Sequence, residues 1–128
     1  MRIDPQSHVP IFQQIADGVR SAIAGGVYRP GESLPSVRAM AIELRVNPNT
    51  VQRAYEGLER DGVVESRRGV GMFVLRRGAQ SAKNQAEAAV QATLQRGVRL
   101  ARSANMSEGQ VQAVFDKVID QVSREKAK

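Results

Sequence analysis

The sequence has no cysteine and a single histidine among its 128 residues. Without cysteine the chain can form no disulfide, no thiolate nucleophile and no Cys-based zinc site. The one histidine, His8, falls in an N-terminal segment that we expect to be exposed, and we assign it no role. Catalysis needs reactive groups that converge, whereas the carboxylates here are scattered over helix faces predicted to be exposed. The composition argues against an enzyme and predicts no cofactor or metal.

Long apolar runs are also missing. The first ten residues, MRIDPQSHVP, lack the apolar core of a signal peptide. No uninterrupted apolar stretch approaches the length that spans a membrane. These absences predict a soluble protein with no membrane partner, and the lack of cysteine fits a reducing cytoplasm.

Positive charge is in excess. The formal net charge is +6 and the isoelectric point is about 10.5, which suggests a polyanionic partner. Arginine and lysine outnumber aspartate and glutamate in both 1–76 and 77–128. Small basic proteins are often merely soluble, so the net charge alone does not establish a polyanionic partner. The positions of the charges must decide whether there is one.

Apolar periodicity predicts two helices in the first third of the chain. Isoleucine or valine recurs at every fourth position, at Ile11, Ile15, Val19 and Ile23, and Phe12 and Ala16 widen this apolar stripe. This spacing is typical of a helix that packs one face on a core, and two glycines at 25–26 end it. A turn-rich connection follows, with room for a very short strand over 32–34. The second helix is predicted from about 36 to 44.

The stretch LRVNPNTVQRAYEGLERDG, residues 44–62, places a proline just after a helical pattern. Asn47 is a good N-cap, and Pro48 is tolerated next to it because first-turn amides have no intrahelical partner. Pro48 therefore begins a third helix, which we expect to extend to about Asp61 and to end at Gly62. Four of its residues are expected to face the core: Val51, Ala54, Tyr55 and Leu58. Two short helices joined by a three-residue turn form a helix-turn-helix.

A β-hairpin is predicted after the third helix. Two short β-prone runs, 63–64 and 72–75, flank the sequence RRGVG. Arg67 and Arg68 at this tip could lie along a DNA backbone while a glycine enters the minor groove. The alternative is a hairpin with solvated arginines and no partner.

Two helices are predicted beyond the hairpin, after a polar linker over 76–85. The first runs from about 81 to 102, and the second begins at Ser107, where SEGQ can form a capping box. Both carry apolar stripes, and two helices alone bury too little surface to be stable. We expect an intersubunit helical bundle; the alternative is that both helices pack on the chain's own first domain. Disorder is predicted only over 124–128.

The predicted fold class is mainly α with a small β-hairpin wing. A winged helix-turn-helix domain is expected over 1–76, and a helical dimerisation region with two C-terminal helices over 77–128. Two-fold symmetry of such a homodimer would impose a palindromic DNA site.

The outer face of the third helix is polar. Seven of its residues are not expected to face the core: Asn49, Thr50, Gln52, Arg53, Glu56, Glu59 and Arg60. Amide, hydroxyl and guanidinium groups come first and carboxylates later, as suits a helix that enters the major groove by its N-terminal end. Asn and Gln can pair bidentately with adenine, and Arg with guanine. The alternative is an ordinary solvated helix face; the basic wing that follows favours DNA.

Four segments of the chain resemble the winged helix of GntR-type bacterial transcription regulators: PIFQQI, GVYRPGESLPSVR, VNPNTVQRAYEGLERDG and GVGMFV. The resemblance covers residues 9 to 75 almost without gaps. The short helical tail resembles the YtrA subfamily, whose members dimerise through two helices.

The resemblance implies DNA contacts at several positions. Arg38 of the LPSVR motif would contact phosphate or a base at the edge of the groove. Five residues would lie in or beside the major groove: Asn47, Asn49, Thr50, Gln52 and Arg53. Gly69 or Gly71 would bring the wing to the minor groove, and Tyr55 would be mainly a packing residue.

The chain departs from the family pattern at two positions. Many members have glycine where this chain has Arg45, and threonine where it has Met72. Arg45 either adds a phosphate contact or lies in solvent.

The predicted function is sequence-specific regulation of transcription, with repression favoured, by a homodimer on double-stranded operator DNA. The alternative is a winged-helix protein-interaction module with a helical dimerisation tail. The sequence leaves the operator and any small-molecule effector open.

Overall fold

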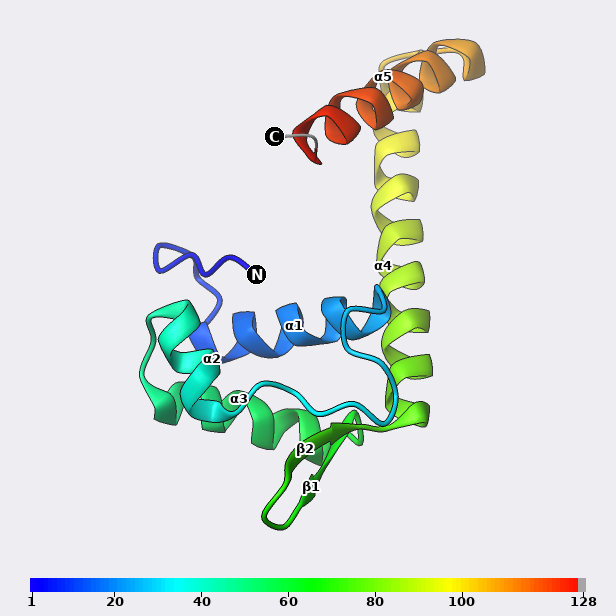
Figure 1. The fold of residues 1–128 in the computed structure, drawn as a ribbon. Coiled ribbons are helices and arrows are strands. Elements are labelled where there is room, and N and C mark those ends of the chain that lie inside the picture. The colour runs from blue at the N-terminus through cyan, green and yellow to red at the C-terminus, as the bar shows by residue number, and fades with distance from the viewer. Residues whose placement is uncertain (127–128) are drawn as a thin grey trace. The chain divides into compact units, whose positions relative to one another are not determined.

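A computed structural model describes residues 1–126 (Figure 1). Five helices and two strands occur in this part of the chain: α1 (Ile11–Ala24), α2 (Val37–Leu44), α3 (Pro48–Arg60), β1 (Val64–Arg67), β2 (Gly71–Val74), α4 (Arg76–Ser103) and α5 (Glu108–Lys126). The chain divides into two compact units, with the boundary between Glu87 and Ala88. The predicted fold class, mainly α with a hairpin and two C-terminal helices, is confirmed.

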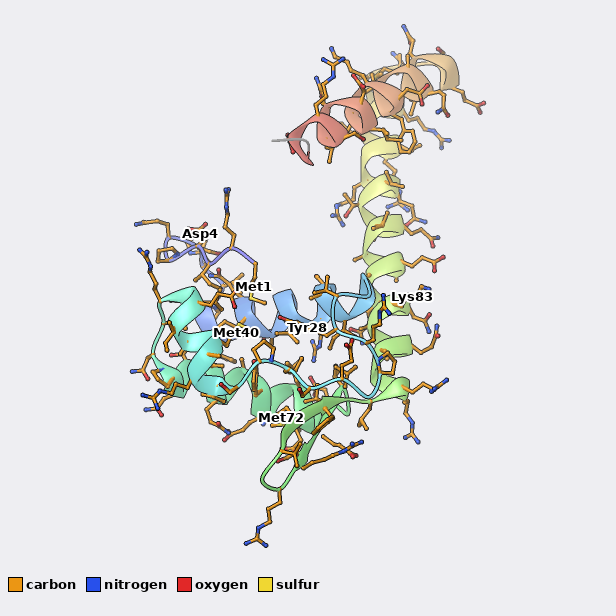
Figure 2. The ribbon with its side chains drawn as sticks, in the orientation of Figure 1. Met1, Asp4, Tyr28, Met40, Met72 and Lys83 are labelled. Atoms are coloured by element: carbon orange, nitrogen blue, oxygen red, sulfur yellow. The ribbon has the colours of Figure 1, made fainter. Side chains whose placement is uncertain are left out.

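The core of the first unit lies among α1, α2 and α3. α3 packs against both α1 and α2, and Figure 2 shows the side chain of Met40 pointing into this core from α2. The inward positions of α3 are fully buried, as predicted: Val51, Ala54, Tyr55 and Leu58. This burial fixes which side of α3 faces solvent.

Side-chain caps set the start of both helices of the helix-turn-helix. The hydroxyl of Ser36 accepts a hydrogen bond from the Ala39 amide at 3.0 Å. The Asn47 carbonyl oxygen Oδ1 accepts from the Asn49 amide at 2.8 Å, and Pro48 occupies the first helical position. The predicted N-cap and proline start are confirmed.

The hairpin pairs β1 with β2 in antiparallel register, from Val64 opposite Val74 to Arg67 opposite Gly71. Gly69 has a φ of +77° in the intervening turn, a conformation that glycine adopts without steric cost. The very short strand predicted over 32–34 is a single bridge between Ser33 and Phe73.

The predicted linker over 76–85 is wrong, because α4 begins at Arg76. Its first turns pack on the winged helix through small residues. Ala82 is buried in the core, and a Cβ at Gly78 would lie 2.4 Å from the Cα of Val63. The polar composition of 76–85 gave no sign of this contact, because glycine is also typical of flexible linkers.

In the second unit, the predicted capping box opens α5. The Ser107 hydroxyl accepts from the Gln110 amide at 3.2 Å, and the Gln110 side chain accepts from the Ser107 amide at 2.8 Å. The predicted disorder over 124–128 is wrong as far as Lys126, where α5 ends; residues 127–128 lie outside the described residues. No helix within 1–126 is long and apolar enough to cross a membrane.

Candidate nucleic-acid interface

The N-terminal half of α3 presents the polar residues that the sequence singled out. Asn49, Gln52 and Arg53 are exposed, and Thr50 is half-buried. Their neighbours on the opposite side of the helix are buried, so the four side chains share one accessible face. The arrangement suits a helix presented to a groove.

Asn47 is exposed at the start of α3, and its amide oxygen already accepts one hydrogen bond. The Asn49 backbone amide uses one of the two lone pairs of Oδ1, and both Nδ2 donors remain for another partner. Asn47 is suited to a phosphate oxygen, which accepts hydrogen bonds.

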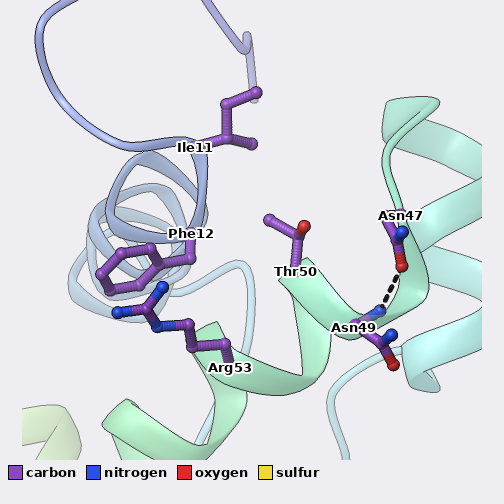
Figure 3. Close-up of a pocket in the computed structure, with 6 residues that line it drawn as sticks. All are labelled: Ile11, Phe12, Asn47, Asn49, Thr50 and Arg53. Atoms are coloured by element: carbon purple, nitrogen blue, oxygen red, sulfur yellow. Dashed lines mark hydrogen bonds between the residues drawn. The ribbon is translucent and has the colours of Figure 1, made fainter.

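A shallow hollow lies where the first turns of α1 and α3 meet (Figure 3). It is lined by Ile11, Phe12, Asn47, Asn49, Thr50 and Arg53. The Arg53 guanidinium carbon Cζ lies 3.8 Å from the centroid of the Phe12 ring. Sequence reasoning placed Phe12 in the core stripe of α1 and missed this contact, which joins residues 41 positions apart and leaves no local signal.

The carboxylates of α3 are engaged by donors of the first unit. Glu56 accepts from the Gln52 side-chain amide at 3.1 Å, and Glu59 accepts from the Ser66 backbone amide at 3.0 Å. Glu59 thereby joins α3 to the first strand of the hairpin.

Arg38 and Arg45 are both exposed at the helix-turn-helix. Arg45 ends α2 in the left-handed conformation, with φ 57° and ψ 49°. Glycine adopts this conformation without strain, which gives a physical reason for the glycine that the resemblance leads us to expect at this position. This position therefore carries an exposed cation in a backbone conformation that is strained for a residue with a side chain.

Tyr55 is a packing residue in this structure. Its side chain is buried, and its hydroxyl donates to the Pro35 carbonyl at 2.7 Å. This bond joins α3 to the connection just before α2. Burial, with smaller contributions from Tyr28 and Glu43, raises the pKa of Tyr55 above its ordinary value.

The two arginines of the hairpin tip differ in their contacts within the protein. Arg67 is paired, because its Nε donates to Glu65 at 3.2 Å and its Cζ lies 4.3 Å from the Phe73 ring centroid. Arg68 is exposed in the turn, next to Gly69, and Gly71 is also exposed at the start of β2. Within the described residues Arg68 forms no ion pair, so it is the less committed of the two cations.

The second unit carries a different kind of surface. Large apolar side chains of α4 and α5 are 40–73% exposed: Val90, Leu94, Val98, Leu100, Val114, Phe115, Val118, Ile119 and Val122. Several of them line an apolar groove between the two helices. Within residues 1–126, no three His, Cys, Asp or Glu side chains are grouped so as to hold a metal ion.

Comparison with known sequences assigns the family. The sequence model described as "Bacterial regulatory proteins, gntR family" matches residues 11–74, from α1 through β2. The chain belongs to this family. The resemblance seen in its four motifs is confirmed, and the family is one of regulatory proteins.

Individual relatives agree with the assignment. The HTH-type transcriptional repressor YtrA of Bacillus subtilis is 43% identical over 74 residues, covering 58% of this chain and 57% of that protein. The uncharacterized HTH-type transcriptional regulator YhcF of the same organism is 52% identical over 69 residues, covering 54% and 57% respectively. This chain therefore spans little more than half the length of these two curated relatives.

A solved structure matches over a longer range. A transcriptional regulator from Oenococcus oeni has a TM-score of 0.72 and 25% sequence identity, over 91% of this chain and 97% of that chain. The likeness thus extends beyond the winged helix into the helical tail.

Proposed function

We propose that this GntR-family chain is a sequence-specific DNA-binding regulator that represses transcription as a homodimer on a palindromic operator, in the cytoplasm. The observation that carries the proposal is the exposed polar face at the start of α3, where Asn49, Gln52 and Arg53 project from a helix whose opposite side is buried. A relative named as a transcriptional repressor supports the sign of regulation.

α3 would enter the major groove by its N-terminal end. Donors and acceptors that match base edges come from its first two turns, and its positive dipole end favours nearby phosphate. Glu56 and Glu59 come later, where each already accepts a hydrogen bond. Their position beyond the first two turns keeps these negative charges away from the end of α3 that would enter the groove.

Four other positions would hold the DNA backbone rather than read bases. Arg38, Arg45 and the free Nδ2 of Asn47 lie at the helix-turn-helix, and Arg68 lies at the wing tip. Gly69 and Gly71 would let the wing approach the minor groove closely, because neither carries a side chain. Arg67 would contribute less, since Glu65 already pairs with it.

A selection followed by a titration tests DNA recognition. Duplexes are selected from a random library by the wild-type chain, and binding is then compared with a scrambled duplex at one salt concentration. We expect Gln52→Ala to weaken the selected duplex by about 1–3 kcal/mol and the scrambled one much less. The matched control is Gln112→Ala in α5, because Gln112 also donates to an acid four residues on, at 3.0 Å. A chain that retains no duplex even at low salt would instead favour the protein-interaction module.

The apolar face of the second unit is the proposed dimer interface. The exposed valine, leucine, isoleucine and phenylalanine side chains of α4 and α5 form a patch that a monomer would leave in water. Phe115→Asp in the full chain should give a monomer by sedimentation. Val27→Asp, which changes an exposed apolar residue of the first unit, should leave the dimer intact. A Phe115→Asp chain that stays fully dimeric would refute this interface.

A further inference from the structure

We infer that Phe12 of α1 is a positioning residue for DNA recognition: its ring holds the Arg53 guanidinium in a fixed orientation before DNA binds. The inference rests on the proposed function and adds to it a residue outside the helix-turn-helix. Phe12 and Arg53 line the same hollow at the start of α3 (Figure 3).

The contact geometry leaves the donors of Arg53 available. With Cζ 3.8 Å from the ring centroid, the guanidinium must turn its face to the ring, because an edge-on approach would push a nitrogen inside van der Waals distance. A guanidinium stacked in this way keeps its N–H groups around its rim. Within residues 1–126, no hydrogen bond or ion pair involves the Arg53 side chain. The rim can therefore pair with the two acceptors of a guanine.

The ring itself is held in place. Phe12 is half-buried and packs against the hydrophobic core, and α1 packs along α3. The ring of Phe12 is thus supported by the core and also contacts Arg53. A long side chain loses rotamer freedom when it binds, and this cost is smaller for a side chain that is already ordered.

The contact between Arg67 and Phe73 differs from that between Arg53 and Phe12, because the Arg67 guanidinium also makes a hydrogen bond within the protein. Arg67 lies over Phe73 with Cζ 4.3 Å from the centroid, but its Nε also donates to Glu65. Part of its rim is used, so this contact suits a stiff wing rather than base recognition. Phe12 is therefore the aromatic residue that leaves its arginine free to read a base.

The test is a double-mutant cycle on the full chain with two DNA probes: a duplex selected from a random library by the wild type, and its scrambled version. Phe12→Leu keeps an apolar side chain but removes the ring face. We expect it to weaken the selected duplex about two- to fivefold, as for an exposed cation–π contact, and the scrambled duplex hardly at all. Phe12→Tyr, which keeps the ring, should restore binding. In an Arg53→Ala background, Phe12→Leu should have no further effect.

Each contrary result has a distinct meaning. If Phe12→Leu weakens both duplexes equally, or still weakens binding in the Arg53→Ala background, Phe12 acts only through the stability of α1 and the inference is overturned. It is overturned as well if Phe12→Leu binds like the wild type. A wild-type chain that retains no duplex from the random library, even at low salt, would overturn the proposed function together with this inference.

Discussion

Gly78 lies in the first turn of α4, where that helix passes over the residues that precede the wing. A Cβ built at Gly78 would be 2.4 Å from the Cα and 2.6 Å from the carbonyl oxygen of Val63. Both are backbone atoms, which cannot turn aside like the end of a long side chain. Replacing Gly78 with alanine improves helix propensity by about 0.5–1 kcal/mol, but overpacking of this kind costs about 1–3 kcal/mol. We expect Gly78→Ala to lower the free energy of unfolding by about 1 kcal/mol.

Gly57→Ala is the matched control for Gly78→Ala. Gly57 is also helical, yet the nearest atom to a built Cβ is the Nη2 at the flexible end of Arg60, 3.4 Å away. This variant should gain about 0.5–1 kcal/mol from helix propensity alone. The assay is urea unfolding of both full-length variants followed by circular dichroism, at one protein concentration because a dimer would make stability concentration-dependent. If Gly78→Ala proves as stable as Gly57→Ala, α4 does not approach Val63 closely, and the docking of its first turn is refuted.

Three further predictions concern the helix-turn-helix and the wing. Arg45→Gly should raise the free energy of unfolding by up to about 1 kcal/mol in urea titrations, since it relieves a left-handed backbone. If the salt dependence of DNA binding is unchanged in this variant, Arg45 contacts no phosphate. Tyr55→Phe should cost about 1 kcal/mol through the lost bond to the Pro35 carbonyl. Because the pKa of Tyr55 is raised in the folded state from 10.0, its contribution is complete below pH 10 and is lost as the pH rises through the folded pKa; the alkaline fall in stability should therefore be smaller in Tyr55→Phe. Arg68→Ala should reduce the slope of log affinity against log salt by about one unit, and Arg67→Ala by less.

Signals that lie close together in the sequence predicted most of the first unit. The start of α3 is encoded by Asn47 and Pro48, a cap and a first-turn residue side by side, and the structure forms the expected capping bond. The apolar spacing of α1 and α3 likewise gave the buried faces correctly. These features depend on interactions within one turn of helix or one helix face, which a single sequence records directly.

Features that depend on contacts between distant segments were missed. The first turns of α4 were predicted as a linker because their composition is polar, and only the position of Val63 shows why a glycine is needed at residue 78. Phe12 was read as part of the core, since its spacing fits the apolar stripe of α1. Its contact with Arg53 depends on how α1 and α3 pack, which no periodicity reveals.

The hydrogen bonds of the fold also limit which amide can read a base. Bidentate pairing with adenine uses both the carbonyl oxygen and the NH₂ group of an amide side chain. The Oδ1 of Asn47 already accepts the capping bond of α3, which restricts the orientation of its amide and leaves one lone pair. One of the two Nε2 donors of Gln52 is engaged by Glu56, so this amide would have to share or exchange that bond to pair with a base.

Asn49 differs from both, because within residues 1–126 its side chain makes no hydrogen bond that would have to break, and it projects from the first turn of α3. Uncommitted donors and acceptors avoid the cost of exchanging one partner for another. We therefore expect the adenine preference of a selected site to be lost in Asn49→Ala. In Asn47→Asp, which keeps a capping oxygen but adds a negative charge near phosphate, binding to selected and scrambled duplexes should instead weaken alike. If the adenine preference survives in Asn49→Ala and disappears in Asn47→Asp, the cap does not hold in the complex, and this division of roles is wrong.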